Sequence, residues 1–495
     1  MSGKTDYHDL GLLVKTGSPI ITVETREEVR TINVLCQIAV AHGRPLYSWD
    51  HVDGLKRADF KTDFHKDEST IDPMAMLEHI KKSNQSCIYV LCDFHPHFED
   101  SPRVVRMIKE IALNNEKVRQ TIIFVSHQLK LPPEISAYAS RFELSLPDTK
   151  QLEALVKEEA QNWSKQNHNQ KVKTDSATLS KLVNNLVGTT FADARRLIRN
   201  VIADGMITDD DLPTLSKAKF ELLDMDSVLS FEYETSRFSE VGGLTHLKSW
   251  LQKREKVFLD RNAPLQPPKG IMLVGIQGGG KSLAAKAVAG MWGVPLLRLD
   301  FGAIYNKYHG ESEKNLRESL KMAELMEPCV LWLDEIEKGI STGESDGGTS
   351  MRILATLLTW MAEKKQRVFV VATANDISKL PPELMRKGRL DEIFFVDLPD
   401  YKSRMEIFAI HIKMRDQDSS KIDLKKLAEA TEGFTGSEIE QAVVSALYHA
   451  YSEGHELTTE SIIEAISQTR PLSVVMKEKI DALRDWAQSR TVMAN

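Results

Sequence analysis

Residues 272–282 read Met272-Leu-Val-Gly-Ile-Gln-Gly-Gly-Gly-Lys-Ser282 and decide the fold of the C-terminal half of the chain. They contain the pattern Gly-x4-Gly-Lys-Ser. An apolar run precedes it and a helix-forming run follows, as in a phosphate-binding loop between strand and helix. Glycines let successive backbone N–H groups face a polyphosphate, and the helix start adds its positive dipole end. The stretch predicts a nucleoside triphosphate site; the alternative is a glycine turn that merely precedes Lys-Ser.

The chemistry of such a loop assigns a role to each side chain. We expect Lys281 to reach the β- and γ-phosphates and the Ser282 hydroxyl to ligate Mg²⁺. The backbone amides that approach the phosphates are expected from four further residues: Gly278, Gly279, Gly280 and Leu283.

A second motif lies beyond the loop, where an apolar run from Val330 ends in Asp334 and Glu335. Asp334 at a strand tip can orient magnesium, and Glu335 can polarise water for attack on the γ-phosphate. Two carboxylates after an apolar run are weak evidence alone. Their place after the loop, with another expected strand at 296–299 between them, makes them the expected second NTPase motif.

Bulk properties limit the function classes. The 495 residues are too many for one core, and the net charge of −7 gives no indication of nucleic acid as a whole-surface partner. Four cysteines show neither metal spacing nor a disulfide framework, which suits a reducing compartment. No run approaches the roughly 20 apolar residues of a membrane span, and no apolar signal region opens the chain. We expect a cytoplasmic protein without a membrane span.

The first half of the chain echoes the second. Strand-like runs at 18–23, 45–49, 87–92 and 120–125 alternate with helical patterns, which indicates a parallel sheet covered on both faces. Four segments recur in the same order about 245 residues later. The pairs are 87–93 with 329–334, 131–135 with 380–384, 142–148 with 394–400, and 188–193 with 433–438.

This repeat predicts an α/β protein with tandem domains, each a parallel sheet with flanking helices plus a helical lid. At the place of the phosphate loop the first half has Val23-Glu-Thr-Arg-Glu-Glu-Val29, without its glycines and lysine. We therefore interpret the first domain as a degenerate copy; the alternative is an unrelated α/β domain. Asp93, His95, His97 and His127 would lie near its strand ends, where a metal site is the alternative to the usual solvated histidines of such loops.

Composition suggests the domain boundaries. We expect the degenerate domain at 1–206, with its core at 1–147 and its lid at 148–206. The acidic stretch 207–236 is interpreted as a linker, 237–399 as the nucleotide-binding core, and 400–495 as its helical lid and C-terminal helix.

Residues from about 238 to 490 resemble the AAA family of ATPases in its narrow sense. Within that family the chain is most similar to the hypothetical chloroplast reading-frame AAA proteins, also found in bacteria, and there the resemblance covers its whole length. The motifs that carry it are Phe238-Ser-Glu-Val-Gly-Gly-Leu244, Val371-Ala-Thr-Ala-Asn375, Leu384-Met-Arg-Lys-Gly-Arg-Leu-Asp391, Ile410-His-Ile-Lys-Met414 and Gly433-Phe-Thr-Gly-Ser437.

The resemblance implies ATP and Mg²⁺ as cofactors, the plastid stroma as the location if the protein is plastid-encoded, and further site residues. Asn375 would contact the γ-phosphate or the attacking water, and Arg386 and Arg389 would reach the nucleotide of a neighbouring subunit. Two arginines at a glycine-bounded loop suit planar recognition of phosphate charge; surface charge is the alternative. If a neighbouring subunit supplies these two arginines, the protein forms a head-to-tail homo-oligomeric ring, which the resemblance implies is a hexamer. The residues around adenine and at the lid would be Val241, Gly242, His411, Gly436 and Ser437.

Residues 304–311 resemble the family's first pore loop, with Lys307, Tyr308 and His309 at its centre. An aromatic side chain facing a ring axis can grip an extended polypeptide without reading its sequence. A buried Tyr308 is the alternative, and His309 replaces the usual aliphatic residue. Gly339–Gly348 fits a second pore loop.

The phosphate loop also departs from the family's common form. Ile276 and Gln277 replace prolines and Gly279 replaces threonine. The extra glycine is expected to make ordering of the empty loop more costly in entropy, without abolishing nucleotide binding.

Three hypotheses for function remain. The leading one is a ring-forming ATPase that couples Mg-ATP hydrolysis to remodelling of a protein client whose identity the sequence does not reveal. The second is a nucleotide-gated assembly or regulator without threading. The third, a nucleic-acid-loading ATPase, is disfavoured by the acidic balance and by the lack of a helix-turn-helix or zinc module.

Overall fold

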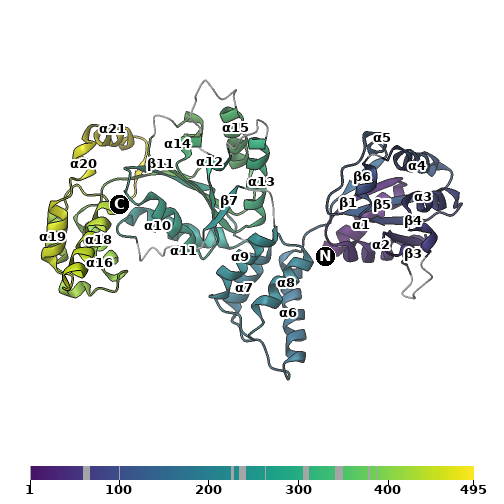
Figure 1. Cartoon of the computed structure of the whole chain (residues 1–495), viewed down its shortest axis with the longest axis horizontal. Helices are drawn as coiled ribbons and strands as arrows, with labels where there is room; N and C mark the ends of the chain where they lie inside the picture. Colours follow the sequence, from purple (N-terminus) through teal and green to yellow (C-terminus); the bar gives the residue numbers. More distant parts are fainter. Residues whose placement is uncertain are drawn as a thin grey trace. The chain divides into compact units, whose positions relative to one another are not determined.

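The computed structural model describes residues 2–59, 67–99, 101–223, 228–232, 241–261, 263–304, 311–339, 349–376, 380–386 and 388–495. The chain forms two compact units, which Figure 1 draws in the colours of the sequence. The first unit comprises Met1–Ala154 with Thr190–Ala194, and the second comprises Leu155–Thr189 with Arg195–Asn495.

The first unit is built on a six-stranded sheet. Its strand order is β3-β2-β4-β5-β1-β6, and every neighbouring pair except β2–β3 is parallel. Runs of buried apolar residues form the central strands, as parallel sheets covered on both faces require. The strands are β1 (Ile20–Glu24), β2 (Leu46–Asp50), β3 (Gly54–Arg57), β4 (Ile88–Cys92), β5 (Thr121–Ser126) and β6 (Ala139–Phe142).

Helices cover both faces of this sheet. One apolar core joins the sheet to α1 (Ser2–Thr16) and α2 (Glu28–His42), and another joins it to α3 (Pro73–Lys82) and α4 (Pro102–Leu113). A short helix, α5 (Pro133–Ser136), precedes β6. Helix α1 and strand β3 lie where the sequence patterns predicted no element.

The second unit contains a seven-stranded sheet in the order β13-β12-β8-β11-β10-β9-β7. Only β7 runs antiparallel to its neighbour. The strands are β7 (Leu229–Glu232), β8 (Gly270–Gly275), β9 (Leu296–Leu299), β10 (Cys329–Leu333), β11 (Val368–Ala374), β12 (Glu392–Val396) and β13 (Val492–Met493).

Two apolar cores flank this sheet as well. One includes α10 (Thr245–Leu259) and α11 (Lys281–Trp292), and the other includes α13 (Glu311–Leu325) and α15 (Thr349–Glu363). Short helices α12 (Phe301–Ile304) and α14 (Ile336–Gly339) follow β9 and β10.

The two sheets share one topology. The order β6-β1-β5-β4-β2 in the first unit repeats as β12-β8-β11-β10-β9 in the second, and α2 follows β1 as α11 follows β8. Because four sequence echoes fall on equivalent elements of equal order, the prediction of a tandem α/β fold with a degenerate first copy is confirmed.

A helical lid follows β12. Its helices are α16 (Tyr401–Lys413), α17 (Leu424–Ala430), α18 (Gly436–Glu453) and α19 (Thr459–Ser467), which share an apolar core of their own. After α20 (Leu472–Val475) and α21 (Lys477–Gln488) the chain returns to the sheet as β13.

Along the chain, four helices separate β6 from β7: α6 (Thr149–Gln166), α7 (Ser176–Leu186), α8 (Phe191–Val201) and α9 (Asp211–Leu223). Most of the expected first lid, 148–206, groups with the second unit, and the expected linker, 207–236, contains α9 and β7. Buried Leu212 and Leu215 turn one face of α9 inward despite its acidic start. Lys219 is also buried and donates from Nζ to the Val187 carbonyl oxygen at 2.5 Å.

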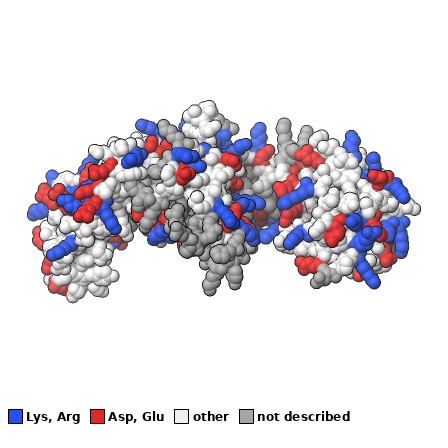
Figure 2. All heavy atoms as spheres, turned by 90° about the horizontal axis from the view of Figure 1, so that it is seen from above, with Lys and Arg blue, Asp and Glu red and all other residues white. Residues whose placement is uncertain are grey.

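The surface mixes charges of both signs. Figure 2 shows Lys and Arg interspersed with Asp and Glu over the face in view, without one continuous basic surface. Within the described ranges, no helix has the length and apolarity that crossing a bilayer requires. All four cysteines are free thiols.

Candidate functional site

The phosphate loop connects β8 to α11 in the second unit. Gly278 and Gly280 adopt φ values of +76° and +91°, which L side chains rarely take. A Cβ on Gly278 would also lie 3.1 Å from the Thr435 hydroxyl oxygen, so the lid approaches this turn closely. The glycines therefore give the loop its path and leave room for the lid.

Lys281 begins α11 and points back into the loop. Its Nζ donates to the carbonyl oxygens of Gly275 at 3.0 Å and Ile276 at 2.8 Å, and only 6% of the residue is exposed. Burial lowers the pKa of Lys281 to about 8, against the opposing effect of nearby carboxylates. Without a ligand, the lysine thus relies on two loop carbonyls for its hydrogen bonds.

Asp334 and Glu335 follow β10 directly. Asp334 accepts a hydrogen bond from Thr373 Oγ1 at 2.9 Å and one from Arg298 Nη2 at 2.9 Å. Glu335 has a φ of +46°, and its backbone N–H donates to Thr373 Oγ1 at 3.0 Å. The buried Thr373 hydroxyl therefore links the side chain of Asp334 to the backbone of Glu335.

Asn375 directly follows the neighbouring strand, β11, and faces Glu335. Its Nδ2 donates to Glu335 Oε1 at 3.0 Å, and its backbone N–H donates to buried Glu337 Oε1 at 2.9 Å. The other carboxylate oxygen of Glu335 forms an ion pair with Lys338. This arrangement holds the Glu335 carboxylate beside the strand that carries Asn375.

The lid closes one side of the site. The Ser437 backbone N–H and hydroxyl each donate to the Gly278 carbonyl oxygen at 3.3 Å. Thr435 and Glu438 form a reciprocal capping box at the start of α18. The lid helix is thereby fixed with its N-terminus at the phosphate loop, where a dipole favours anions.

An apolar wall lies on the far side of the loop. It combines Val241, Gly242 and Leu244 with Ile407, Ile410, His411 and Met414 of the lid. Burial lowers the pKa of His411, although Glu440 opposes the shift, so the neutral imidazole is favoured. A flat aromatic base fits such an environment.

These groups line one cavity of about 600 Å³. It contains every predicted ATP-site and magnesium-site residue that we assigned from the sequence except Arg386 and Arg389: Val241, Gly242, Gly278, Gly279, Gly280, Lys281, Ser282, Leu283, Asp334, Glu335, Asn375, His411, Gly436 and Ser437.

The remaining predicted residues lie elsewhere. Arg386 is exposed, whereas Arg389 is half-buried and donates from Nη1 to the Glu383 carbonyl oxygen. The pore-loop residues 307–309, the second pore loop at 340–348, and the opening motif before Val241 fall outside the described residues.

Sequence reasoning missed three supporting residues: Thr373, Glu337 and Arg298. Each contacts a predicted catalytic or metal-binding residue. A lone arginine in the apolar run 296–299 was a usable signal, since charge in a buried strand needs a partner. Thr373, inside the Val371–Asn375 motif, was a similar signal.

The cavity can accept magnesium together with a nucleotide. Ser282 and Asp334 both line it and offer oxygen donors, the kind Mg²⁺ prefers. Mg²⁺ usually binds through one or two protein oxygens plus phosphates and waters, so these two residues fit it. Nowhere in the described part of the chain do three His, Cys, Asp or Glu side chains form a metal cluster, the histidines of the first unit included.

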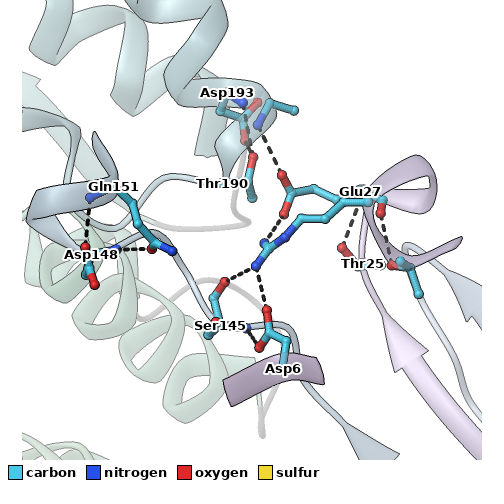
Figure 3. A network of polar contacts seen from close by, with 11 residues as sticks. Asp6, Thr25, Glu27, Ser145, Asp148, Gln151, Thr190 and Asp193 are labelled. Atoms are coloured by element: carbon cyan, nitrogen blue, oxygen red, sulfur yellow. Dashed lines mark hydrogen bonds and ion pairs between the residues drawn. The ribbon is translucent and has the colours of Figure 1, made fainter. Parts of the chain in front are cut away.

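The equivalent place in the first unit is filled by the chain's own side chains (Figure 3). Arg30 pairs with Glu27 at 2.7 Å and Asp6 at 2.6 Å. The Ala192 backbone N–H, at the start of α8, donates to Glu27 Oε1 at 3.1 Å. The Glu27 carboxylate thus binds the start of α8. In the second unit the corresponding helix start, at Ser437 of α18, faces the phosphate loop instead.

Comparisons with known proteins agree with this geometry. The family model for the ATPase family associated with various cellular activities (AAA) matches residues 271–398, and the AAA+ lid domain matches 421–465. The N-terminal and second domains of SpoVK-like AAA ATPases match residues 7–144 and 150–226.

Relatives extend over the whole chain. The AAA domain-containing protein ycf46 of Pyropia yezoensis is 36% identical over 488 residues, covering 97% of each chain. The ycf46 protein of Guillardia theta is 36% identical over 97% of this chain and 94% of its own. A proteasome-activating nucleotidase of Saccharolobus solfataricus is 34% identical over 50% of this chain and 65% of its own. Because relatives at 36% identity cover 97% of the chain, the chain belongs to the AAA family of ATPases, together with the ycf46 proteins.

Proposed function

We propose that this protein binds Mg-ATP in the cavity of its second unit and hydrolyses it. One observation carries the proposal: three separate places in the fold contribute residues to the same cavity, namely the start of α11 (Lys281, Ser282), the end of β10 (Asp334, Glu335) and the end of β11 (Asn375). Each residue has the functional group that phosphoryl transfer to water needs at its position.

Binding uses the loop, the lid and the apolar wall. The amides of Gly278–Gly280 and the start of α11 face the phosphates, and Lys281 exchanges its two carbonyl contacts for phosphate oxygens. Ser282 and Asp334 would hold Mg²⁺, which when bound neutralises charge on the phosphate oxygens. The base lies between the segment at Val241 and the lid helix carrying His411.

Hydrolysis relies on Glu335 and Asn375. The Glu335 carboxylate accepts a proton from the water that attacks the γ-phosphorus, and the bond to the leaving ADP oxygen breaks. Asn375 orients the carboxylate through its 3.0 Å hydrogen bond. The other carboxylate oxygen of Glu335 pairs with Lys338, and in our proposal the carboxylate leaves this pair to reach the attacking water.

Transition-state charge needs further cations. Arg386 and Arg389 do not line the cavity of their own chain, so we assign them to a neighbouring subunit's nucleotide. This arrangement requires a head-to-tail ring, which we take to be a hexamer. A chain that works only in a ring has no turnover as a monomer.

The output of turnover is, in our proposal, remodelling of a protein client. Two relatives support this output: the proteasome-activating nucleotidase, which matches half of this chain, and a cell division cycle protein 48 homologue of Archaeoglobus fulgidus, which is 32% identical over 60% of it. Lys307, Tyr308 and His309 are the proposed client contacts. The four free cysteines suit the reducing cytoplasm or stroma.

Phosphate release tests the proposal. Glu335→Gln and Arg386→Ala should each lower ATP turnover at least about a hundredfold, and unchanged turnover in both would sink the mechanism. Mixing Arg386→Ala with Lys281→Ala should restore part of the activity, because one subunit supplies the site and its neighbour the arginine. If Tyr308→Ala abolishes remodelling but keeps ATP-driven assembly, threading is supported; if remodelling persists, nucleotide-gated assembly is favoured.

A further inference from the structure

The last residues of the chain are built into the sheet of the second unit. Strand β13 runs parallel to β12, with Val492 opposite Phe394 and Met493 opposite Phe395. The Ala494 N–H donates to the Phe395 carbonyl oxygen at 2.9 Å. Ala494 is 1% exposed and shares an apolar core with Val241 and Leu244. We call residues 492–495 the C-terminal tail.

The tail caps the start of α10. This helix begins after Leu244, a left-handed residue with a φ of +56°, and it has no capping side chain of its own. The N–H groups of His246 and Leu247 each donate to the Ala494 carbonyl oxygen at 3.1 Å, and the Leu244 N–H donates to Asn495 Oδ1. Three amides that a helix start leaves without intrahelical partners are thus satisfied by the tail.

The capped segment is one wall of the nucleotide cavity. Val241, Gly242 and Leu244 line it, immediately before α10. The segment has two further anchors: Lys248 Nζ donates to the Val241 carbonyl oxygen at 2.6 Å, and the N–H of residue 243 donates to Glu406 Oε2 at 2.9 Å. The first anchor comes from α10 itself, so the tail and the lid supply the contacts from outside.

The packing around this wall leaves little space. A Cβ at position 242 would lie 2.7 Å from Ile407 Cγ1, and one at 243 would lie 2.5 Å from Ser403 Oγ and 2.9 Å from Asn495 Oδ1. Two consecutive glycines are therefore needed because the lid packs against both positions and the tail packs against the second of them as well. A displaced tail removes one side of this packing.

Helix α21 fixes where the tail begins. Arg484 forms a forked ion pair with Asp397, the residue after β12, with contacts of 2.8 to 3.0 Å. Leu483 and Trp486 of the same helix pack against the apolar core beside the sheet. The tail is therefore delivered to the edge of β12 by a helix that is itself anchored there.

We propose that Ala494 and Asn495 are positioning residues for nucleotide binding, because they hold the wall at 241–244 against the base. This inference rests on the proposed ATP site and adds to it a contribution from the opposite end of the chain. In the part of the chain that the structure describes, the hydrogen bonds of the tail go to β12 and to the start of α10, and none goes to a phosphate-loop or hydrolysis residue. Loss of the tail should therefore weaken nucleotide affinity and leave turnover at saturating ATP nearly unchanged.

The test compares three full-chain variants with the wild type. One ends at Thr491, one carries Asn495→Ala, and the control carries Met493→Ala, whose side chain is 43% exposed and outside the cap. A helix cap typically contributes enough to change an equilibrium by a few-fold to about thirtyfold. We expect the dissociation constant for ADP to rise about tenfold in the truncated chain and about threefold in Asn495→Ala, and to stay unchanged in the control.

Hydrogen–deuterium exchange of peptides covering 241–250 supplies a readout that does not depend on activity. Both tail variants should lose amide protection there, while the control keeps it. Wild-type binding with unchanged ADP affinity in both tail variants would overturn the positioning role and leave the proposed ATP site standing. Absence of ADP binding in the wild type would overturn both. If the truncated chain fails to fold, Asn495→Ala decides the outcome alone.

Discussion

Replacing Thr373 with valine removes one hydroxyl from the point where β10 and β11 present their catalytic residues. That hydroxyl donates to Asp334 Oδ1 at 2.9 Å and accepts from the Glu335 backbone N–H at 3.0 Å. Thr373 is 2% exposed, so water cannot replace either bond easily. Valine keeps the shape of threonine but provides neither a donor nor an acceptor.

The magnitude follows from these two bonds. A hydrogen bond to a charged group contributes about 1.5–3 kcal/mol, and a buried N–H left unpaired costs about 1–3 kcal/mol. Because the two effects share one group, we expect a combined local loss of about 2–4 kcal/mol. If half of this loss appears in the transition state, kcat falls about 5- to 30-fold at roughly 1.4 kcal/mol per tenfold change.

The assay is steady-state phosphate release, with ADP titration and thermal unfolding measured on the same samples. Thr373→Ser is the matched control because it keeps the hydroxyl and loses only a methyl group. We expect the serine variant to retain most of its kcat and the valine variant to lose it, with ADP affinities within about threefold of wild type. Equal kcat values for the two variants would refute the role given to the hydroxyl.

Three further predictions address the loop and the first unit. The pKa of Lys281 falls from 10.5 to about 8 on folding, so between these pH values the unfolded chain binds more protons than the folded one and the free energy of unfolding rises with pH. In urea unfolding of the nucleotide-free protein, Lys281→Met should flatten that rise. Arg30→Met leaves buried carboxylates unpaired and should cost the first unit about 3 kcal/mol, measured by urea unfolding, while ADP affinity stays unchanged. Gly278→Ala forces an L residue to a φ of +76° and crowds Thr435, so this variant should have a weaker affinity for ADP than wild type. Calorimetry without magnesium measures that affinity, and Ser282→Ala, the control, should bind ADP more tightly than Gly278→Ala under the same conditions.

Much of the second unit could be predicted because its functional residues occupy strand ends and a loop of fixed spacing. The glycine loop, Asp334, Glu335 and Asn375 each follow an apolar run, and parallel strands bring their carboxyl ends to one edge. The duplication was also visible in the sequence, since four short segments recur in order. Confirmation came from the equal strand order of the two sheets.

The supporting contacts could not be predicted because they depend on register. Arg298 reaches Asp334 only because it lies opposite Trp332 on the adjacent strand. Thr373 reaches Asp334 because each residue directly follows a member of the strand pair Leu333–Ala372. A single sequence does not specify such pairings.

The elements that the patterns missed are short or have misleading composition. Helix α9 begins with acidic residues, so its stretch read as a linker, and β13 has only two residues. The pairing of Arg30 with Asp6 joins residues 24 positions apart through a helix, α1, that the patterns did not predict.

The central claim is that one site per chain, in the second unit, binds and hydrolyses ATP, while the first unit carries none. Equilibrium binding of ADP combined with phosphate release by wild type, Lys281→Ala and Glu335→Gln tests it most directly. The account predicts one ADP per chain, loss of binding in Lys281→Ala, and retained binding without turnover in Glu335→Gln. Two ADP molecules per chain, or turnover that survives Glu335→Gln, would contradict it.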